Sequence, residues 1–206
     1  MTGWLLALHS STPVLGVAAL QLEDPEATRR VLTRPAGREL TNGLLGAVEE
    51  VLPAQHWPTI ARLAVATGPG GFTGTRLTVV MARTLAQQVQ CPLDGASSFA
   101  LMAPRLAKDA GLAATEDPFW IVQTLPRRGR VAGAYRLGPQ GDVEELEKPY
   151  LLTDDAQPSP ALAMAENVEA DVSRFLDLCF AAHQQGRSAS WDGVLPHYPT
   201  SPVGVV

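Results

Sequence analysis

A ten-residue segment with four glycines constrains the fold more than any other part of the chain. It reads Thr-Gly-Pro-Gly-Gly-Phe-Thr-Gly-Thr-Arg over residues 67–76, between an apolar run at 60–66 and a helix-period stretch at 77–90. Glycine is needed where φ is positive or where another group approaches closely, and the N–H groups at a helix start favour an anion. The segment predicts either a tight strand-to-helix turn or a phosphate-binding loop.

Composition restricts the class of protein. With 206 residues, of which 46% are hydrophobic, the chain can bury a substantial core. The net charge is −5, and no basic block is interleaved with aromatic residues, so strong direct binding of nucleic acid is not expected. The apolar residues 4–8 are too few to span a membrane and lack the basic flank of a signal peptide. Cys91 and Cys179 are far apart, which favours free thiols in a reducing cytoplasm.

Apolar periodicity predicts a first lobe over residues 1–107. Its strands are expected at residues 4–8, 14–22, 28–33, 60–66 and 91–96. Its helices are expected at residues 39–52, 73–90 and 97–106, the last one capped by Ser97 or Ser98.

A second, smaller lobe is expected over residues 108–206, because residues 107–118 lack apolar periodicity. Its strands are expected at residues 119–125, 131–137 and 143–150. An amphipathic helix at 169–185, ended by Gly186, and an extended proline-rich tail from residue 191 follow.

The helices at 39–52 and 73–90 carry signs of close packing. Gly43 and Gly46 each cost a helix about 1 kcal/mol relative to Ala, which suggests that another backbone packs against them. In the first helix, Leu44 and Leu45 are expected to face inward with three later apolar residues. The second helix is apolar on two sides, so one side covers a sheet and the other requires either the first helix or another protein chain. The residues expected at a partner interface are Gly43, Gly46, Ala47, Val79, Met81, Ala82, Arg83 and Ala86.

The element order is that of the first lobe of the α/β actin-like ATPase and sugar kinase (ribonuclease H-like) architecture, with two lobes, mixed sheets and flanking helices. Residues 5–13, 38–52 and 68–76 resemble the bacterial TsaB (YeaZ) family. The resemblance covers about residues 3–105 well and the second half weakly, through residues 127–130 and 196–198.

This resemblance implies a non-catalytic subunit of the complex that forms N6-threonylcarbamoyladenosine at position 37 of tRNAs reading codons that begin with A. The family implies a heterodimer with the catalytic paralogue TsaD, joined by the ATPase TsaE, and tRNA contact only through the complex. No cofactor is then expected on this chain, and ATP and magnesium belong to the partners. Alone, the chain is expected to form a homodimer through the same helices, since so large an apolar face seldom stays in water.

The distribution of acids argues against catalysis. Phosphoryl transfer in an actin-like fold requires carboxylates at the phosphate loops to hold magnesium. Residues 1–22 and 51–93 contain no Asp or Glu. His9 stands where relatives have Asp, and Leu40 stands where the family often has His. No catalytic residue and no metal site are therefore expected, and His9 is interpreted as a hydrogen-bonded structural side chain.

The second hypothesis is an ATP-dependent phosphotransferase of the actin-like class that uses the glycine loop as a phosphate cradle. Its ligand candidates are Ser10, Ser11, Thr12, Gly70, Gly71, Phe72, Thr73, Gly74 and Arg76. The hydroxyl groups equally suit the closure of a hairpin, and Arg76 suits an ion pair across an interface. For Arg127, Arg128 and Arg130, a solvated strand end is favoured over contact with RNA.

Overall fold

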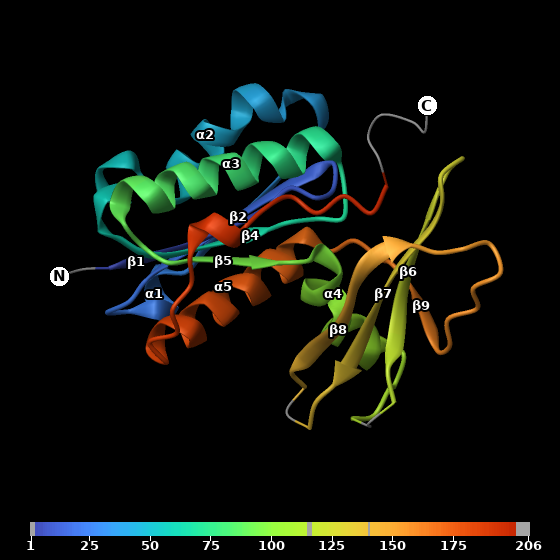
Figure 1. The fold of residues 1–206 in the computed structure, drawn as a ribbon. Helices are drawn as coiled ribbons and strands as arrows, with labels where there is room; N and C mark the ends of the chain where they lie inside the picture. The colour runs from blue at the N-terminus through green and yellow to red at the C-terminus, as the bar shows by residue number, and fades with distance from the viewer. Residues whose placement is uncertain (1–2, 115–116, 140, 201–206) are drawn as a thin grey trace.

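Two β-sheets with helices packed against them form the fold, in nearly the element order that the sequence predicts (Figure 1). The computed structural model describes residues 3–114, 117–139 and 141–200. The helices are α1 (Pro25–Thr28), α2 (Leu40–Val51), α3 (Phe72–Val89), α4 (Ser98–Asp109) and α5 (Val168–Gln184). Short 3-10 segments lie at Gly37–Glu39, Ala54–Thr59 and Trp191–Gly193. Among these described helices, none has the length and apolar character needed to cross a bilayer.

The first sheet is built around the N-terminal strand. β1 (Trp4–His9) pairs antiparallel with β2 (Val14–Gln21), and β2 pairs antiparallel with β3 (Arg30–Pro35). On its other side β1 pairs in parallel with β4 (Ile60–Ala66), and β4 pairs in parallel with β5 (Leu93–Ala96). The strand order is β3-β2-β1-β4-β5.

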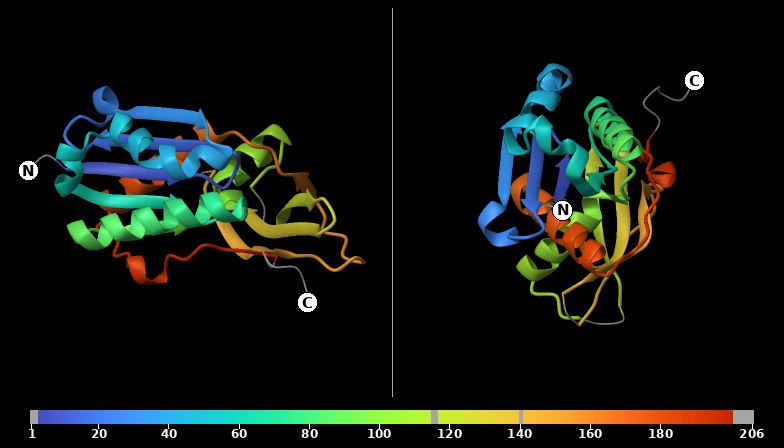
Figure 2. Two further views of the ribbon diagram at one scale, coloured as in Figure 1. Left: turned by 90° about the horizontal axis from the view of Figure 1, so that it is seen from above. Right: turned by 90° about the vertical axis from the view of Figure 1, so that its left-hand side faces the viewer.

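Both faces of this sheet are buried, because successive side chains of β1 point to opposite faces and both sets are apolar. Leu6 and Leu8 belong to the cluster that includes α2 and α3 side chains, whereas Leu5 and Ala7 belong to the cluster that includes α5. Figure 2 shows α2 and α3 together on one side of the sheet and α5 on the other. The ends of β1 and β4 are thereby fixed on both sides, which positions the turns that follow them.

The second sheet has the order β8-β7-β6-β9. Its strands are β6 (Phe119–Leu125), β7 (Gly129–Leu137), β8 (Val143–Leu151) and β9 (Ala161–Ala163). Helix α4 lies between the two sheets and packs Phe99 and Met102 with Phe119 and Tyr135 of the second one. Ser97 caps α4, because its Oγ accepts a hydrogen bond from the Ala100 N–H at 3.0 Å.

The chain returns to the first sheet after β9. Helix α5 packs on that sheet, and Val194 from the following tail enters the core beneath α3. Arg62 on β4 is 2% exposed, makes two hydrogen bonds to the Asp94 carboxylate at 2.6 and 2.7 Å, and donates to the Arg187 carbonyl oxygen. A division at residue 107 therefore separates the two sheets but leaves α5 and the tail with the first one.

The main differences from the sequence prediction concern β3, α4 and β9. β3 begins at Arg30 and not at residue 28, because Pro25–Thr28 forms a helical turn whose Ala27 N–H is capped by the Asp24 carboxylate at 3.2 Å. Helix α4 extends to Asp109. Strand β9 was not predicted, since three residues are too few to show an alternating pattern, and it forms by pairing with β6.

Candidate functional site

The turn after β1 and the glycine loop after β4 touch each other directly. The Gly71 N–H donates to the Ser11 carbonyl oxygen at 2.9 Å, and a Cβ added at Gly70 would overlap that same oxygen. A Cβ at Gly74 would lie 2.8 Å from the Ser10 carbonyl oxygen. Gly70 and Gly74 are therefore required for the close approach of one backbone to another, and the Gly71 N–H is already used as a donor within the chain.

The three hydroxyl residues of the first turn have different roles. Ser10 Oγ lies 2.7 Å from Thr78 Oγ1 of α3, which ties the turn to that helix. Thr12 Oγ1 accepts from the Val14 N–H at 3.1 Å and so closes the turn that leads into β2. The Ser11 hydroxyl is buried and has no hydrogen-bond partner among the described residues. Of these three hydroxyls, only that of Ser11 is unpaired among the described residues, and Thr75 Oγ1 of the glycine loop is likewise buried without a partner there.

A cavity of about 490 Å³ lies between these loops and the second sheet. Its walls include Ser11, Gly70 and Phe72 from the first sheet's loops, Arg128 from the turn between β6 and β7, and Glu166 and Tyr198 from the segments around α5. The volume suits a small ligand. One cation and one carboxylate line it, so the charged groups do not form the uniformly positive surface that binding a polyphosphate needs.

His9 is fully buried at the end of β1, and neither ring nitrogen has a hydrogen-bond partner among the described residues. Burial lowers the pKa of this imidazole to about 4, so it is neutral at pH 7. The predicted hydrogen bond to His9 is therefore wrong, while the side chain does occupy a structural position in the core. A neutral, enclosed ring at this point contributes no negative charge to the adjoining loops.

No group of three or more His, Cys, Asp or Glu side chains is arranged to hold a metal ion within residues 3–114, 117–139 and 141–200. The other histidines lie apart: the His56 ring is 5.4 Å from Trp4, and His197 Nε2 is hydrogen-bonded to the Pro149 carbonyl oxygen. Cys91 and Cys179 are free and buried, as predicted.

Four of the residues expected at a partner interface lie inside the protein. Ala47, Val79, Ala82 and Ala86 are each fully buried against the first sheet, and they have no surface to offer a partner. The interface assignment of Val79, Ala82 and Ala86 is corrected accordingly: this stripe of small residues faces the sheet, because it allows the closest approach of helix and strands. Leu77, Met81 and Leu85 of the other stripe are partly buried beside it.

The surface of α2 and α3 differs from the expected one in its large residues. Leu45, predicted to face inward, is 54% exposed, and Val80 of α3 is 55% exposed. A Cβ added at Gly43 or Gly46 would meet nothing within 4 Å, so no backbone of the described residues packs against them. This face is left open by the fold.

The candidate arginines have short-range partners of their own. The Arg76 guanidinium lies 4.3 Å from the centre of the Phe72 ring, and Arg83 Nη1 donates to the Val194 carbonyl oxygen at 3.1 Å. Arg127 and Arg128 are exposed in the turn between β6 and β7, whereas Arg130 donates to the Ala156 carbonyl oxygen at 2.7 Å. Among the residues that the structure describes, none of these arginines makes an ion pair.

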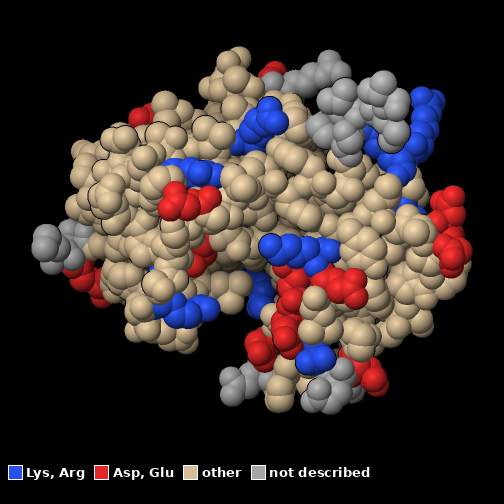
Figure 3. All heavy atoms as spheres, viewed as in Figure 1, with Lys and Arg blue, Asp and Glu red and all other residues tan. Residues whose placement is uncertain are grey.

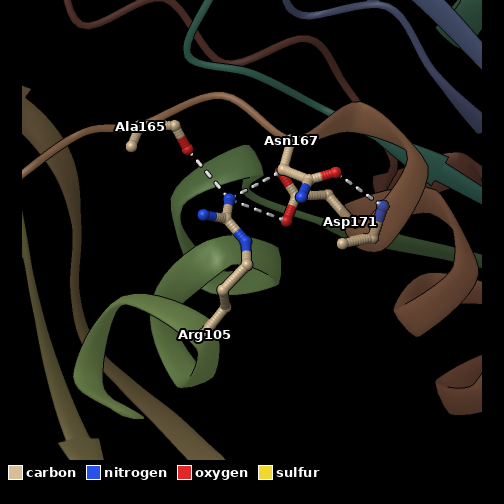
Figure 4. Close-up of polar contacts among 5 residues, drawn as sticks. Arg105, Ala165, Asn167 and Asp171 are labelled. Atoms are coloured by element: carbon tan, nitrogen blue, oxygen red, sulfur yellow. Dashed lines mark hydrogen bonds and ion pairs between the residues drawn. The ribbon is translucent and has the colours of Figure 1, made fainter. Parts of the chain in front are cut away.

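The wall of the cavity next to Glu166 is held by an ion pair between α4 and α5 (Figure 4). Arg105 Nη2 lies 3.3 Å from Asp171 Oδ1 and donates to the Ala165 carbonyl oxygen at 2.8 Å. Asn167 caps α5 by accepting from the Ala170 N–H at 3.1 Å. Burial raises the pKa of the Asp171 carboxyl to about 6 even though Arg105 opposes that shift.

A family model described as "TsaD: tRNA N6-adenosine threonylcarbamoyltransferase" matches residues 31–137, just over half of the chain. A protein of Bacillus subtilis (strain 168) named "tRNA threonylcarbamoyladenosine biosynthesis protein TsaB" is 29% identical over 107 residues. The chain belongs to the TsaD-type family. Its similarity to the Bacillus protein supports the predicted resemblance to the TsaB (YeaZ) proteins. The aligned region spans 48% of this chain and 43% of the Bacillus TsaB protein. The predicted family is confirmed.

Two solved structures from Pseudomonas aeruginosa are similar over nearly the whole chain. One is an uncharacterised protein with similarity to peptidase YEAZ, at a TM-score of 0.73 and 22% identity over 96% of this chain and 100% of that one. The other is YeaZ, at a TM-score of 0.67 and 22% identity over 95% and 99%. These likenesses confirm the predicted actin-like, ribonuclease H-like fold.

The contact at Gly70 predicts a matched pair of stability changes. Gly70→Ala forces a Cβ against the Ser11 carbonyl and should lower the free energy of unfolding by about 2 kcal/mol. Gly71→Ala meets nothing within 4 Å and should change it by only a few tenths of a kcal/mol. Urea denaturation of both variants checks this, and equal effects would contradict it.

The burial of His9 predicts a pH effect on stability. Because its folded pKa of about 4 lies below the unfolded value near 6.5, neutral His9 costs nothing above pH 6.5, and stability is lost as pH falls from 6.5 to 4. The full loss is about 3 kcal/mol. His9→Leu should remove this slope between pH 7 and 4, as measured by urea denaturation.

The wild type is the necessary reference for His9→Leu, because Asp171 acts in the opposite sense. Its raised pKa makes the folded state gain stability as pH falls through 6. The difference between the two proteins isolates His9, and parallel pH curves would show that its ring titrates normally.

Proposed function

We propose that this chain is the non-catalytic subunit that binds a TsaD-type protein in the complex forming N6-threonylcarbamoyladenosine at position 37 of tRNA. The observation that carries the proposal is the contact of the Ser11 carbonyl with Gly70 and Gly71 in a chain related to TsaB. In this proposal the ATPase TsaE joins through the complex, and ATP, magnesium and tRNA are handled by the partners. The expected compartment is the cytoplasm, in keeping with two free cysteines.

The glycine loop, which bonds to the turn after β1, supports a role without phosphoryl transfer. A phosphate cradle needs backbone N–H groups that are free to point at the phosphate, and magnesium needs nearby carboxylates. Here the Gly71 N–H is bonded to Ser11, and the sequence stretches that form both loops contain no Asp or Glu. His9, neutral and buried, does not replace the missing charge.

The open face of α2 supports partner docking. Gly43 and Gly46 weaken a helix, yet no atom of the residues that the structure describes occupies the space beside them. Leu45, on the same helix, exposes a large apolar side chain. A partner helix that packs closely against α2 would use both features, and the same face would give the homodimer expected when the partner is absent.

The proposed mechanism is a population shift. A surface that binds the competent conformation of the TsaD-type partner more tightly than its other conformations raises the fraction of active enzyme without supplying a reacting group. The magnitude of activation is then set by that difference in affinity.

Co-expression with the cognate TsaD-type protein and TsaE, followed by an assay of tRNA modification with and without this chain, tests the proposal. We expect modification to depend on the chain, and the chain alone to show no magnesium-dependent ATP turnover. The phosphotransferase alternative requires such turnover, so its appearance in the purified chain, or modification that proceeds equally well without it, would reject the proposal.

Gly46→Leu separates folding from docking. Leucine is a better helix former than glycine and has room here, so the free energy of unfolding should rise by up to about 1 kcal/mol. Its bulk should weaken binding of the TsaD-type partner at least tenfold in a titration. Gln184→Leu, which adds an exposed leucine to α5, is the matched control and should leave binding unchanged. If Gly46→Leu binds the TsaD-type partner with unchanged affinity, the interface lies elsewhere on the chain.

A further inference from the structure

A groove runs between α3 and the tail that follows α5, on the side of α3 away from α2. We call it the α3 groove; it has a volume of about 360 Å³ and is lined by Arg76, Val80, Arg83, Trp191, Leu195 and Tyr198. Val80 and Leu195 are 55% and 59% exposed, among the most exposed large apolar side chains of the described residues. The tail forms one side of the groove. It is fixed there because the His197 N–H donates to the Thr67 carbonyl oxygen and Arg83 donates to the Val194 carbonyl oxygen.

Two arginines of the α3 groove and the apolar residue between them have helical spacing. Arg76, Val80 and Arg83 stand at positions i, i+4 and i+7, so they lie along one face of α3. At a rise of 1.5 Å per residue, the two arginines are separated by roughly 10 Å along the helix axis. An exposed apolar side chain between two cations is thus presented over two helical turns.

Both arginines are held in place by contacts within the chain, and neither forms an ion pair with a described residue. Arg76 lies over the Phe72 ring, and Arg83 lies 5.9 Å from the centre of the Trp191 ring while it donates to the Val194 carbonyl. Neither is among the ion pairs of the described residues, and no carboxylate lines the groove. Figure 3 shows two basic groups over α3, one of them with an acidic side chain beside it, whereas most acidic side chains in this view gather over the second sheet. Fixing these side chains in advance lowers the entropy that binding would cost.

We propose that the α3 groove binds an amphipathic helix of the TsaD-type partner that carries an apolar side chain between two carboxylates about seven residues apart. This inference rests on the proposed function and adds a second contact to the open face of α2. The apolar side chain would cover Val80 and Leu195, and each carboxylate would pair with one arginine, a geometry that suits the guanidinium fork.

The same charge pattern disfavours a second copy of this chain in the groove. Residues 51–93, which contain all of α3, have no Asp or Glu. Two α3 helices related by a two-fold axis would place arginine opposite arginine, and like charges held together are repulsive. An acidic helix from a different chain is the occupant that these charges select.

Binding of the purified cognate TsaD-type protein, measured by calorimetry at 50 and 300 mM NaCl, tests the inference. We expect the wild-type affinity to fall with salt, Arg76→Glu to weaken binding about tenfold, and Arg76→Glu with Arg83→Glu to weaken it about a hundredfold with little salt dependence. Because Arg83 also anchors the tail, Arg76→Glu alone is the variant that leaves the tail contacts unchanged, and circular dichroism checks its fold. Lys108→Glu with Arg187→Glu makes the same change in net charge at exposed positions outside the groove and should bind like the wild type.

The outcomes distinguish this inference from the function on which it rests. If the wild-type chain does not bind the TsaD-type protein, the proposed function fails. If it binds and the double arginine variant binds equally well, only the assignment of the α3 groove is overturned. Sedimentation of the chain alone gives a third reading: a homodimer that the arginine variants dissolve, with partner binding intact, would show that a second copy fills the groove.

Discussion

The backbone contact between the Ser11 carbonyl and Gly70–Gly71 is the constraint from which the arrangement around the loops follows. It joins the turn after β1 to the turn before α3, and it exists only because position 70 has no Cβ. The start of α3 is thereby fixed over the end of the first sheet, with the Ser10–Thr78 contact as a second tie. Since α3 is fixed at that end, its small residues can lie flat on the sheet and its larger ones are turned toward α2, the tail and solvent.

The same contact distinguishes this chain from an actin-like protein whose loops bind a phosphate. In an actin-like fold, loops at these positions can direct free N–H groups at a phosphate, with magnesium held by carboxylates. In this chain the loops bond to each other, a neutral histidine stands at the end of β1, and the exposed features are helix faces. The most distinctive chemistry of the molecule therefore lies on its surface, in exposed apolar side chains and in two arginines that form no ion pair with the described carboxylates. Such features are typical of recognition.

Much of the fold could be predicted from periodicity and turn residues. Strands β1, β4 and β6 and helices α2, α3 and α5 lie within one or two residues of their expected bounds, because each has a clear apolar period and a clear stop signal. The candidate site was harder to predict than the fold. Val79 and Ala82 were expected at an interface and are buried, since a helix with two apolar stripes does not reveal which stripe meets the sheet. The prediction that Leu45 faces inward was wrong for a related reason. Its position on the apolar side of α2 says nothing about how far the neighbouring element extends.

By itself the sequence determined the order of elements, the family, and the absence of acids from both loop segments, because these depend on residue types and their spacing along the chain. Only the tertiary structure decided that Gly70 is packed against a carbonyl while Gly43 and Gly46 face open space. Three glycines look alike in a sequence, since a missing Cβ records that space is needed and not which atoms, if any, will occupy it. Likewise the tail reaches α3 from more than a hundred residues away, and the pairing of Leu195 with Val80 across one groove arises only when both are brought to the same face.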